Sequence, residues 1–361
     1  MRVLFITQVI DRKDDNLGAV HGWIEALARE AEAVHAIALR TGTVELPPNV
    51  CVHSLGKDSG NGKARQLQIF NSVVGRLAMR REVDVFFAHM VPRYALLVAP
   101  YRLLFGIPTA TWYAHNSADL KLKLANLCTD RFVTVSRDSF PLGLEKCCVV
   151  GHGVDTNLFT PPAPPTASTS GKVRFLSLGR ISPRKELDTL VSAADLLVNR
   201  WGRRDVEFVV AGAPLASSDH KYYERLRSRV EELRLHDLFH FIGGVPHSEA
   251  VRQLQACDFF VNMHVEGGLG KAVLEAMSCE KPAFVSTPTY YERFPEYGSA
   301  FLFQPRDHED LALKLRNALE LPEEERTRIG AALRAWIVEE HDVRRQMSRI
   351  VDAFRTLRRR N

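Results

Sequence analysis

Hydrophobic residues in the first half of the chain fall into short runs, and segments with helical spacing lie between several of these runs. Apolar runs of about four to eight residues bounded by turn residues are typical of buried strands. The expected strands are residues 3–7, 35–39, 50–53, 85–89, 109–115, 132–136 and 147–150. The expected helices include residues 22–31, 64–80 and 118–127. Because strands that alternate with helices join through right-handed crossovers, this half predicts a parallel sheet.

A second series of the same kind begins near residue 172. The expected strands are residues 173–178, 206–211, 238–242, 259–262, 283–286 and 300–303. The expected helices lie near residues 186–199, 221–234, 247–256, 270–279, 308–319 and 323–338. The fold class is therefore α/β, with two doubly wound, Rossmann-like domains facing across a cleft. In such sheets, ligands bind at the carboxyl ends of the strands.

The two series are separated by a segment without apolar periodicity. Residues 160–171 begin TPPAPPTASTS, and their prolines exclude helix and ladder pairing, so they predict a linker. We expect an N-terminal domain at 1–159 and a C-terminal domain at 172–340. Residues 341–361 predict a helix that packs back on the N-terminal domain. Its basic end, with Arg358, Arg359 and Arg360, favours a solvated tail, with weak membrane contact as the alternative.

Composition supports two globular domains and limits the partners. The chain has 361 residues, 45% of them hydrophobic and 25% charged, which is typical of a globular protein too long for one core. The net charge of +5 suits an anionic ligand. It is too small, and too poorly supported by aromatic motifs, to indicate nucleic-acid binding.

The cysteines and the apolar segments predict a cytoplasmic protein. No CxxC pair occurs among the six cysteines, which predicts reduced thiols; they are Cys51, Cys128, Cys147, Cys148, Cys257 and Cys279. The N-terminal apolar run lacks a small-residue cleavage site and predicts a strand rather than a signal peptide. Residues 94–114 are interrupted by Pro100, Gly106 and Pro108, so they predict a helix and then a strand instead of a membrane span.

Residues 258–282 read as a strand, a glycine-rich loop and an amphipathic helix. Gly267, Gly268 and Gly270 allow a close backbone approach, and an anion fits at Lys271 where the helix begins. Glu275, one turn further on, suits the hydroxyls of a ribose. These features predict a nucleoside diphosphate site, and the alternative is an ordinary turn with solvated charges.

Two sharper nucleotide motifs are excluded. Val265 and Ala272 stand where a P-loop requires Gly and Ser or Thr. After Gly151 and Gly153, Thr156 takes the place of the third glycine of a dinucleotide fingerprint.

Arg180 and Lys185 add two cations near the start of another helix. Gly179 and Arg180 close the first strand of the second domain, and Lys185 follows five residues later. Cations at a helix N-terminus beside a strand's carboxyl end suit a diphosphate. Ordinary loop charge, with Arg184 beside them, is the alternative.

With these motifs, nearly the whole chain resembles the retaining glycosyltransferases of family 4, glycosyl transferases group 1, which have the GT-B fold. The resemblance rests on GRISPRKELDTL at 179–190, AGAP at 211–214, FIGGVPHSEAVRQLQACDFFV at 241–261 and LGKAVLEAMSCEKP at 269–282. GHGVDTNLF at 151–159 is similar to the family's interdomain turn, with His152 in place of the more usual Asn.

The resemblance implies site residues in both domains. It implies that Arg180 and Lys185 hold the donor diphosphate and that His115, at the end of a strand, lies near the reacting sugar. The implied donor-binding residues are Gly18, Gly243, Gly244, Val245, Gly267, Gly268, Leu269, Gly270, Lys271 and Glu275. His21, Trp23 and His89 are candidates for the acceptor side by position only, and core packing is the equal alternative.

One position departs from the family pattern. The family's first acidic residue would stand at Gly267, eight residues before Glu275, whereas the nearest carboxylate is Glu266. That glutamate usually contacts the donor sugar, so the sugar is the least determined part of the prediction. Side-chain direction favours a Glu266 that points to solvent, so that its replacement would have little effect.

The resemblance implies a metal-independent, retaining hexosyltransferase of polysaccharide biosynthesis, without a cofactor beyond its nucleotide sugar. The acceptor would be a glycan, a lipid-linked or a small-molecule hydroxyl. The absence of any Asp-x-Asp motif from the sequence agrees with cationic side chains in place of a metal. The alternative function is a non-catalytic, nucleotide-sugar-binding partner of an active transferase.

Overall fold

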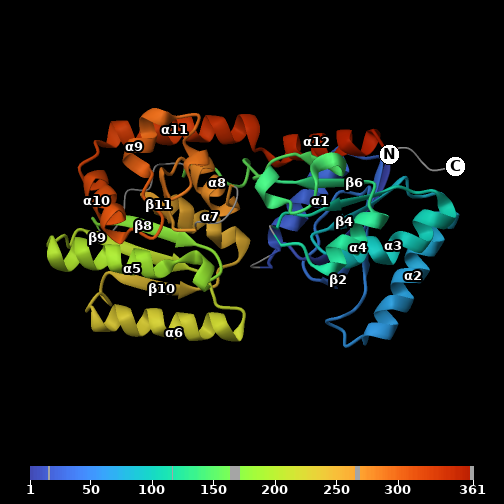
Figure 1. The fold of residues 1–361 in the computed structure, drawn as a ribbon, viewed down its shortest axis with the longest axis horizontal. Helices are drawn as coiled ribbons and strands as arrows, with labels where there is room; N and C mark the ends of the chain where they lie inside the picture. The colour runs from blue at the N-terminus through green and yellow to red at the C-terminus, as the bar shows by residue number, and fades with distance from the viewer. Residues whose placement is uncertain (15–16, 116, 163–170, 265–268, 358–361) are drawn as a thin grey trace. The chain divides into compact units, whose positions relative to one another are not determined.

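The computed structural model describes residues 1–14, 17–115, 117–162, 171–264 and 269–357. Within these residues the chain forms two parallel sheets, each in its own compact unit (Figure 1). The prediction of two doubly wound α/β domains is confirmed.

The described part of the first unit contains a seven-stranded sheet in the order β3-β2-β1-β4-β5-β6-β7. Its strands are β1 (Arg2–Ile10), β2 (Ala33–Thr41), β3 (Val50–Ser54), β4 (Val85–His89), β5 (Thr109–Trp112), β6 (Arg131–Thr134) and β7 (Cys147–Val149). All neighbours pair in parallel. The strand order reverses between β1 and β4, so the loops after these two strands flank the topological switch point.

Helices cover both faces of this sheet. They are α1 (Gly18–Glu30), α2 (Lys63–Met79), α3 (Pro92–Phe105), α4 (Leu120–Cys128) and α12 (Val343–Arg355). The core on one face joins strand residues such as Phe5 and Phe87 to α1 and to Met347 and Phe354 of α12. The core on the other face joins Leu4 and Phe86 to α2 and α3. Short 3-10 turns, η1 (Arg137–Ser139) and η2 (Leu144–Lys146), precede β7.

The described part of the second unit contains a five-stranded sheet in the order β10-β9-β8-β11-β12. Its strands are β8 (Val173–Leu178), β9 (Val206–Ala211), β10 (Phe239–Gly243), β11 (Phe259–Asn262) and β12 (Ala283–Val285). A stack of phenylalanines, Phe175, Phe208 and Phe259, crosses three neighbouring strands with ring centroids 5.3 and 5.5 Å apart. These rings are fully buried and supply a large part of the apolar area of this core.

The helices of this unit follow the strands in the alternating order that the sequence predicts. They are α5 (Leu187–Asp195), continued by the π turn η4 (Leu196–Arg200), α6 (Ser217–Glu232), α7 (His247–Ala256), α8 (Lys271–Ser278), α9 (Pro295–Phe301), α10 (His308–Leu319) and α11 (Glu323–Glu340). Two 3-10 turns, η3 (Pro183–Lys185) and η5 (Pro288–Tyr290), lie in the loops after β8 and β12.

The strand expected at residues 300–303 is wrong. Residues 295–301 form α9, and only an isolated bridge joins Leu302 to Val285. Pro295 takes the first helical position, where its missing N–H costs nothing, and Phe301 packs on Phe284. The apolar run therefore indicates a buried helix end, which periodicity cannot separate from a short strand.

The chain crosses between the units twice. The first unit comprises residues 1–153 and 342–361, and the second comprises residues 154–341. Against the expected end at residue 159, Val154 and Phe159 are buried in the core of the second unit. Arg334 of α11 donates to the carbonyls of Thr156 and Phe159, which explains why this stretch belongs there.

Candidate functional site

The expected donor site lies in the second unit at the carboxyl ends of β8 and β11. The strand order places β9 on one side of β8 and β11 on the other, so the loops after β8 and β11 leave the sheet at its topological switch point. Open α/β sheets bind ligands there. The loop after β8 carries Arg180 and Lys185, and the segment after β11 leads to Lys271 at the start of α8.

Glycines bring the backbone together at this edge of the sheet. A Cβ at Gly212 would lie 2.0 Å from the carbonyl oxygen of Gly179, so no larger residue fits there. Gly212 also donates to the carbonyl of Gly243 over 2.7 Å. Gly179 and Gly243 have φ of +133° and +77°, which side chains rarely adopt. Three loops thus start from one closely packed row of glycines.

Lys185 lies over this row. It ends the turn η3, and a Cβ added at Gly179 would lie 3.6 Å from Lys185 Nζ. Burial, and then the charge of Arg180, lower the pKa of Lys185. Arg180 itself is half-exposed, and its Nε lies 4.0 Å from the buried carboxylate of Asp219. Arg180 and Lys185 are therefore neighbouring cations. The Asp219 carboxylate, on α6, lies at the outer limit of ion-pair distance from Arg180.

His264 ties the loop after β11 to the loop after β8. Its Nδ1 lies 2.8 Å from the carbonyl oxygen of Arg184, so this nitrogen carries the proton and donates. Ser286, after β12, donates to the carbonyl of His264 over 3.3 Å. These contacts fix the turn that carries Lys185. The sequence analysis missed His264, although its place two residues after the buried strand β11 is a signal.

The start of α8 holds a buried carboxylate. Glu275 is 4% exposed, and its Oε1 lies 3.3 Å from both Lys271 Nζ and His247 Nε2. Burial opposes ionisation, but Lys271 and His247 outweigh it and hold the pKa of Glu275 below its usual value. The result is a carboxylate in the middle of α8 that is held between Lys271 and His247.

His247 is a second residue that the sequence analysis missed. It begins α7, four residues after Gly243 ends β10, and its ring packs edge-on to Phe159 at 5.1 Å. A histidine in the first turn after a glycine-rich strand end was the available signal. Its contact with Glu275 brings the loop after β10, which the sequence analysis expects to meet the nucleotide base, against α8.

Gly270 and Leu269 precede α8, and Gly270 is its N-cap. The backbone amide of Gly270 donates to the hydroxyl of Tyr290. An N–H that is already paired is a poor donor for a diphosphate, so the amides at Lys271 and beyond are the better candidates. Gly267, Gly268 and Glu266 lie outside the described residues.

His115 follows β5 in the first unit and is half-buried. Its Nδ1 accepts from the backbone N–H of Ser117 over 3.1 Å and lies 2.8 Å from the Ser117 hydroxyl. Tyr113 in turn donates to the carbonyl of Ser117 over 2.7 Å. Because Nδ1 accepts, the neutral ring carries its proton on Nε2. Nε2–H is therefore a donor of fixed orientation.

The three acceptor-side candidates are buried. His21, Trp23 and His89 are 4%, 7% and 7% exposed. His21 accepts from the amide of Glu45, whereas Trp23 packs edge-on to His89 and to Trp112. His89 also lies 3.2 Å from the hydroxyl of Thr7. This packing leaves little of each side chain for an acceptor. Gly18 is the buried first residue of α1.

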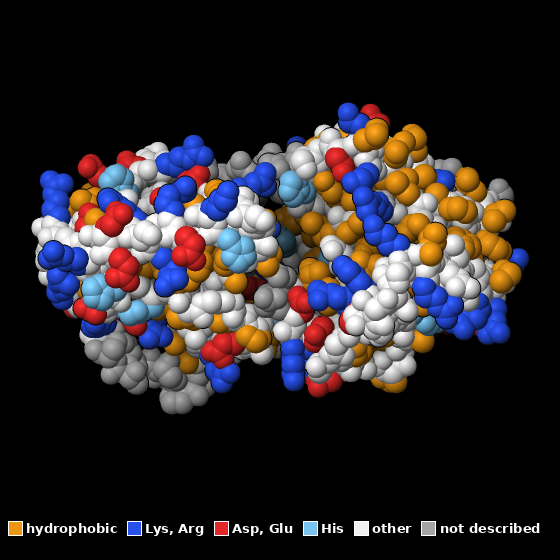
Figure 2. Space-filling view, turned by 90° about the horizontal axis from the view of Figure 1, so that it is seen from below, with side chains coloured by type: hydrophobic (Ala, Val, Ile, Leu, Met, Phe, Trp, Pro, Cys, Tyr) orange, Lys and Arg blue, Asp and Glu red, His pale blue; other side chains and the backbone are white. Residues whose placement is uncertain are grey.

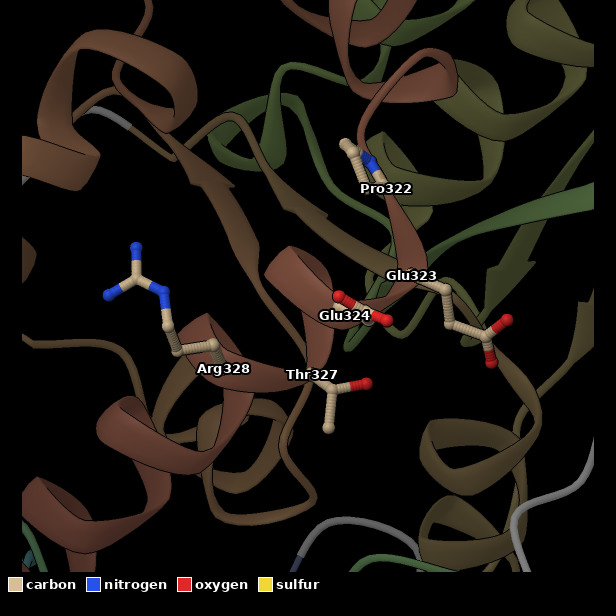
Figure 3. A pocket seen from close by; sticks show the side chains of 5 residues that line it. All are labelled: Pro322, Glu323, Glu324, Thr327 and Arg328. Atoms are coloured by element: carbon tan, nitrogen blue, oxygen red, sulfur yellow. The ribbon is translucent and has the colours of Figure 1, made fainter.

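A shallow hollow lies elsewhere on the second unit, at the start of α11 (Figure 3). It is lined by Pro322, Glu323, Glu324, Thr327 and Arg328. None of these is an expected site residue, and Arg328 is engaged with Glu325. Two carboxylates line the hollow, and its one lining cation, Arg328, is already paired, so the hollow is unfavourable for a diphosphate.

The geometry of the second unit agrees with a comparison to protein families. The model of the family Glycosyl transferases group 1 matches residues 164–336. The second unit belongs to this family. The matched group 1 segment contains Arg180, Lys185, His247, Lys271 and Glu275, and so all the described polar groups of the donor site.

Two relatives of known activity match parts of the chain. Alpha-monoglucosyldiacylglycerol synthase of Streptococcus pneumoniae is 30% identical over 121 residues, which are 33% of this chain and 25% of that protein. The GPI3 subunit of phosphatidylinositol N-acetylglucosaminyltransferase from Saccharomyces cerevisiae is 28% identical over 123 residues, which are 33% of this chain and 25% of that protein. Each match thus spans about a quarter of the relative's length.

Solved structures match the whole chain in fold. Anabaena Alr3699/HepE in complex with UDP has a TM-score of 0.75 at 17% identity, over 99% of this chain and 100% of its own. Sucrose-phosphate synthase from Thermosynechococcus elongatus has a TM-score of 0.75 at 17% identity, over 98% of each chain. The predicted GT-B fold class is thereby confirmed. Among the described residues, no helix has the length and apolar character needed to cross a membrane.

Proposed function

We propose that the protein is a glycosyltransferase that moves a sugar from a nucleotide-diphosphate sugar to a hydroxyl acceptor and retains the anomeric configuration. One observation carries the proposal: the paired cations Arg180 and Lys185 lie at the switch point of a group 1 domain. Burial, and then the charge of Arg180, lower the pKa of Lys185, and an anionic ligand would neutralise both cations.

The donor would bind mainly on the second unit. Arg180, Lys185 and the first amides of α8 would hold the diphosphate, and Gly243, Gly244 and Val245 would meet the base through their backbone. Glu275 would accept from the ribose hydroxyls, with Lys271 and His247 fixing its orientation. Gly18 at the start of α1 would be the approach of the first unit to the phosphates.

Catalysis in this proposal is electrostatic. The bond between the anomeric carbon and the diphosphate oxygen breaks, the acceptor oxygen bonds to that carbon on the same face, and the acceptor proton passes to a donor phosphate oxygen. Arg180 and Lys185 stabilise the charge that grows on the leaving diphosphate. His115, whose Nδ1 accepts from the amide of Ser117, would donate to the sugar through Nε2–H.

For catalysis, no cofactor beyond the nucleotide sugar and no metal is proposed. Two fixed cations supply the positive charge that a divalent ion supplies in other transferases. Turnover that survives EDTA would support this version. Activity that returns only on adding Mn²⁺ or Mg²⁺ would contradict it.

A lipid-linked hydroxyl is the favoured acceptor, because the names of the two relatives are those of enzymes acting on diacylglycerol and phosphatidylinositol lipids. Glycan and small-molecule hydroxyls remain the other classes. The proposed location is the cytoplasm, with peripheral contact at the inner membrane face, and the proposed role is polysaccharide or glycolipid biosynthesis.

The decisive experiment incubates the full chain with a panel of nucleotide sugars and measures release of nucleoside diphosphate. Lys185-dependent release, and an acceptor product whose anomeric configuration matches the donor by NMR, would support a retaining transferase. Binding without release, with or without acceptors, would favour the alternative, a non-catalytic nucleotide-sugar-binding partner.

A further inference from the structure

The outer side of helices α3 and α4 in the first unit is apolar. Leu103 and Leu104 near the end of α3 are 77% and 76% exposed, and Leu120 and Leu127 of α4 are 70% and 73% exposed. Leu124 of α4 is also exposed, and the two helices pack against each other. We call Leu103, Leu104, Leu120, Leu124 and Leu127 the leucine ridge. Figure 2 shows hydrophobic side chains gathered over the first unit, in the right half of that view.

The leucines of the ridge on α4 do not belong to the side of the helix that packs on the core. On α4, Leu122 and Ala125 already fill the inner side and are fully buried. Leu120, Leu124 and Leu127 recur at i, i+4 and i+7 on the outer side, which is the spacing of a second apolar face. A contiguous exposed apolar surface of this kind usually marks a binding surface.

The helical layer that carries the leucine ridge is basic. Helices α2, α3 and α4 contain no Asp or Glu. Their exposed cations are Lys63, Arg65, Arg76, Arg93, Lys121 and Lys123. The flanking carboxylates are engaged, since Asp119 caps α4 by accepting from the amide of Leu122, and Asp130 accepts both ends of the Arg102 guanidinium.

We propose that the leucine ridge docks the protein on an anionic lipid bilayer. Leucines would enter the boundary between headgroups and acyl chains, and Lys121 and Lys123, placed between them in sequence, would reach anionic headgroups. A protein interface fits less well, because lysine is depleted at interface cores. This proposal deepens the proposed function by a partner, the membrane, but concerns binding alone and is tested without turnover.

The test is sedimentation of the full chain with vesicles of phosphatidylcholine alone, or with about 30% phosphatidylglycerol. We expect at least about tenfold stronger binding to the anionic vesicles, weakened by salt. Leu104→Ser with Leu127→Ser should reduce binding about tenfold, and Lys121→Glu with Lys123→Glu should abolish the preference for anionic lipid. Leu215→Ser, an exposed leucine of the second unit, is the matched control.

Two results would overturn this proposal. Loss of binding on deleting residues 358–361, with both ridge variants still binding as the unaltered chain does, would assign the contact to the basic tail. Concentration-dependent self-association in analytical ultracentrifugation that Leu104→Ser removes, without vesicle binding, would assign the leucine ridge to a second copy of the chain.

A separate cluster of metal-ligating side chains lies at the edge of the first sheet. His35 on β2 pairs in register with Cys51 on β3, and His53 follows two residues later on the same face. One ligand atom from each lies within 4.8 Å of the other two, and His35 Nδ1 and His53 Nε2 are 3.4 Å apart.

That nitrogen separation fits a tetrahedral ion. Nitrogens about 2.0–2.1 Å from Zn²⁺ lie about 3.3–3.4 Å apart. Cys51 is exposed and the two histidines are half-buried, so an ion from solution has access. Arg76 on α2 and Glu82 are the charged groups that face the pair, and a thiolate would offset the former.

We infer that His35, Cys51 and His53 form a binding site for a thiophilic divalent ion of the zinc type, with water as the fourth ligand. This site is not part of the proposed catalytic machinery. Its test is titration of the full, reduced chain with Co²⁺ and Zn²⁺, read by the cobalt–thiolate charge-transfer absorption rather than by activity.

We expect one equivalent of Co²⁺ to give that absorption and Zn²⁺ to displace it. Cys51→Ser should remove the absorption, His53→Gln should weaken binding about tenfold or more, and the free cysteine variant Cys128→Ser should bind as the unaltered chain does. An absorption that persists in Cys51→Ser, or no binding in the micromolar range, would overturn the inference.

Discussion

Lys185 is a cation that the fold keeps half-buried beside another cation, Arg180. Such an arrangement lowers the stability of the free protein, and a bound anion would remove this cost by neutralising both charges. We expect Lys185→Met to lower turnover by about a hundredfold, because it removes a charge that stabilises the leaving diphosphate. The same change should leave the Tm unchanged or raise it, because it removes a partly desolvated charge.

The control for this substitution is Lys221→Met, an exposed lysine on α6, which should leave turnover unchanged. Differential scanning fluorimetry and a nucleoside diphosphate release assay measure the two effects. A Tm that falls together with turnover would indicate that Lys185 supports the fold instead of the reaction.

The lowered pKa of Lys185 also predicts how pH acts on binding. Nucleoside diphosphate binding requires the ammonium form, so affinity should be full below the lowered pKa and fall as pH rises through it. In the unfolded chain this lysine holds its proton up to about 10.5, so the free energy of unfolding should rise with pH between the two values. Calorimetry across that range checks both signs, and Lys185→Met should show neither.

Glu275 should contribute to binding of the nucleotide and not to recognition of the sugar. We expect Glu275→Ala to weaken binding of the nucleoside diphosphate and of the whole donor about equally, by about 10- to 100-fold, because a charged hydrogen bond contributes about 1.5–3 kcal/mol. Its stabilising effect, from a folded pKa held below 4.5, is present above that pH and is lost as pH falls through the lowered value. Glu249→Ala on α7 is the control.

Calorimetry with nucleoside diphosphate measures the effect of Glu275→Ala. If nucleotide affinity stayed unchanged while the protein became less stable, Glu275 would belong to the packing of α8 and not to the site.

At the same scale, the elements that carry the charged candidates could be predicted from the sequence, whereas the burial of the first-unit candidates could not. Arg180 and Lys185 follow β8, and Glu275 lies in the helix after β11, and these two strands are neighbours in the second sheet. His21, Trp23 and His89 look like site residues in sequence, but burial depends on contacts such as Trp23 with Trp112, which local patterns do not contain. For the same reason His247, which contacts Glu275 across 28 residues, was missed.

At the scale of elements, the glycine row at the carboxyl ends of β8, β9 and β10 sets how close the loops come. We expect Gly212→Ala to destabilise the second unit by about 1–3 kcal/mol, as overpacking does, because the added methyl would meet the carbonyl of Gly179. It should also weaken nucleotide binding, since Gly179 precedes Arg180. Chemical denaturation and calorimetry measure the two effects.

Gly62→Ala is the matched control for Gly212→Ala. Gly62 precedes α2 with φ of −68°, and no atom lies within 4 Å of an added Cβ. Equal stability of both variants would contradict the role assigned to the glycine row.

Most elements could be predicted from periodicity, and the failures have local causes. The strands from β1 to β12 follow apolar runs whose turn residues mark their ends. Residues 300–303 failed because a short apolar run fits a helix end as well as a strand, and Pro295 two turns earlier was the missed sign of a helix start. The ends of the domains were predicted from composition. Val154 and Phe159 belong to the second unit because their side chains are buried in its core, which composition does not reveal.

At the scale of the whole molecule, α12 completes the first unit. Val343, Met347, Ile350, Val351 and Phe354 are buried in its core. At about 1.5–3 kcal/mol for each buried side chain, their removal costs on the order of 10 kcal/mol, comparable to the stability of a domain. We therefore expect a chain ending at His341 to lose the cooperative unfolding transition of the first unit.

Circular dichroism and calorimetry of this truncated chain, compared with a chain ending at Leu357, check the expectation. Two intact transitions in the shorter chain would show that α12 is dispensable. Nucleotide affinity should persist in both chains if the donor site is carried by the second unit.

Because the first unit is built from residues 1–153 and 342–361, the order of synthesis on the ribosome differs from the order in which the units can be finished. All of residues 154–341 emerge before α12 does, so the second unit can close its core first. The first sheet keeps the α12 side of its core uncovered until α12 itself leaves the exit tunnel. A chain stalled or cleaved before α12 would expose Phe87, which packs on Phe354 of α12, to chaperones and proteases.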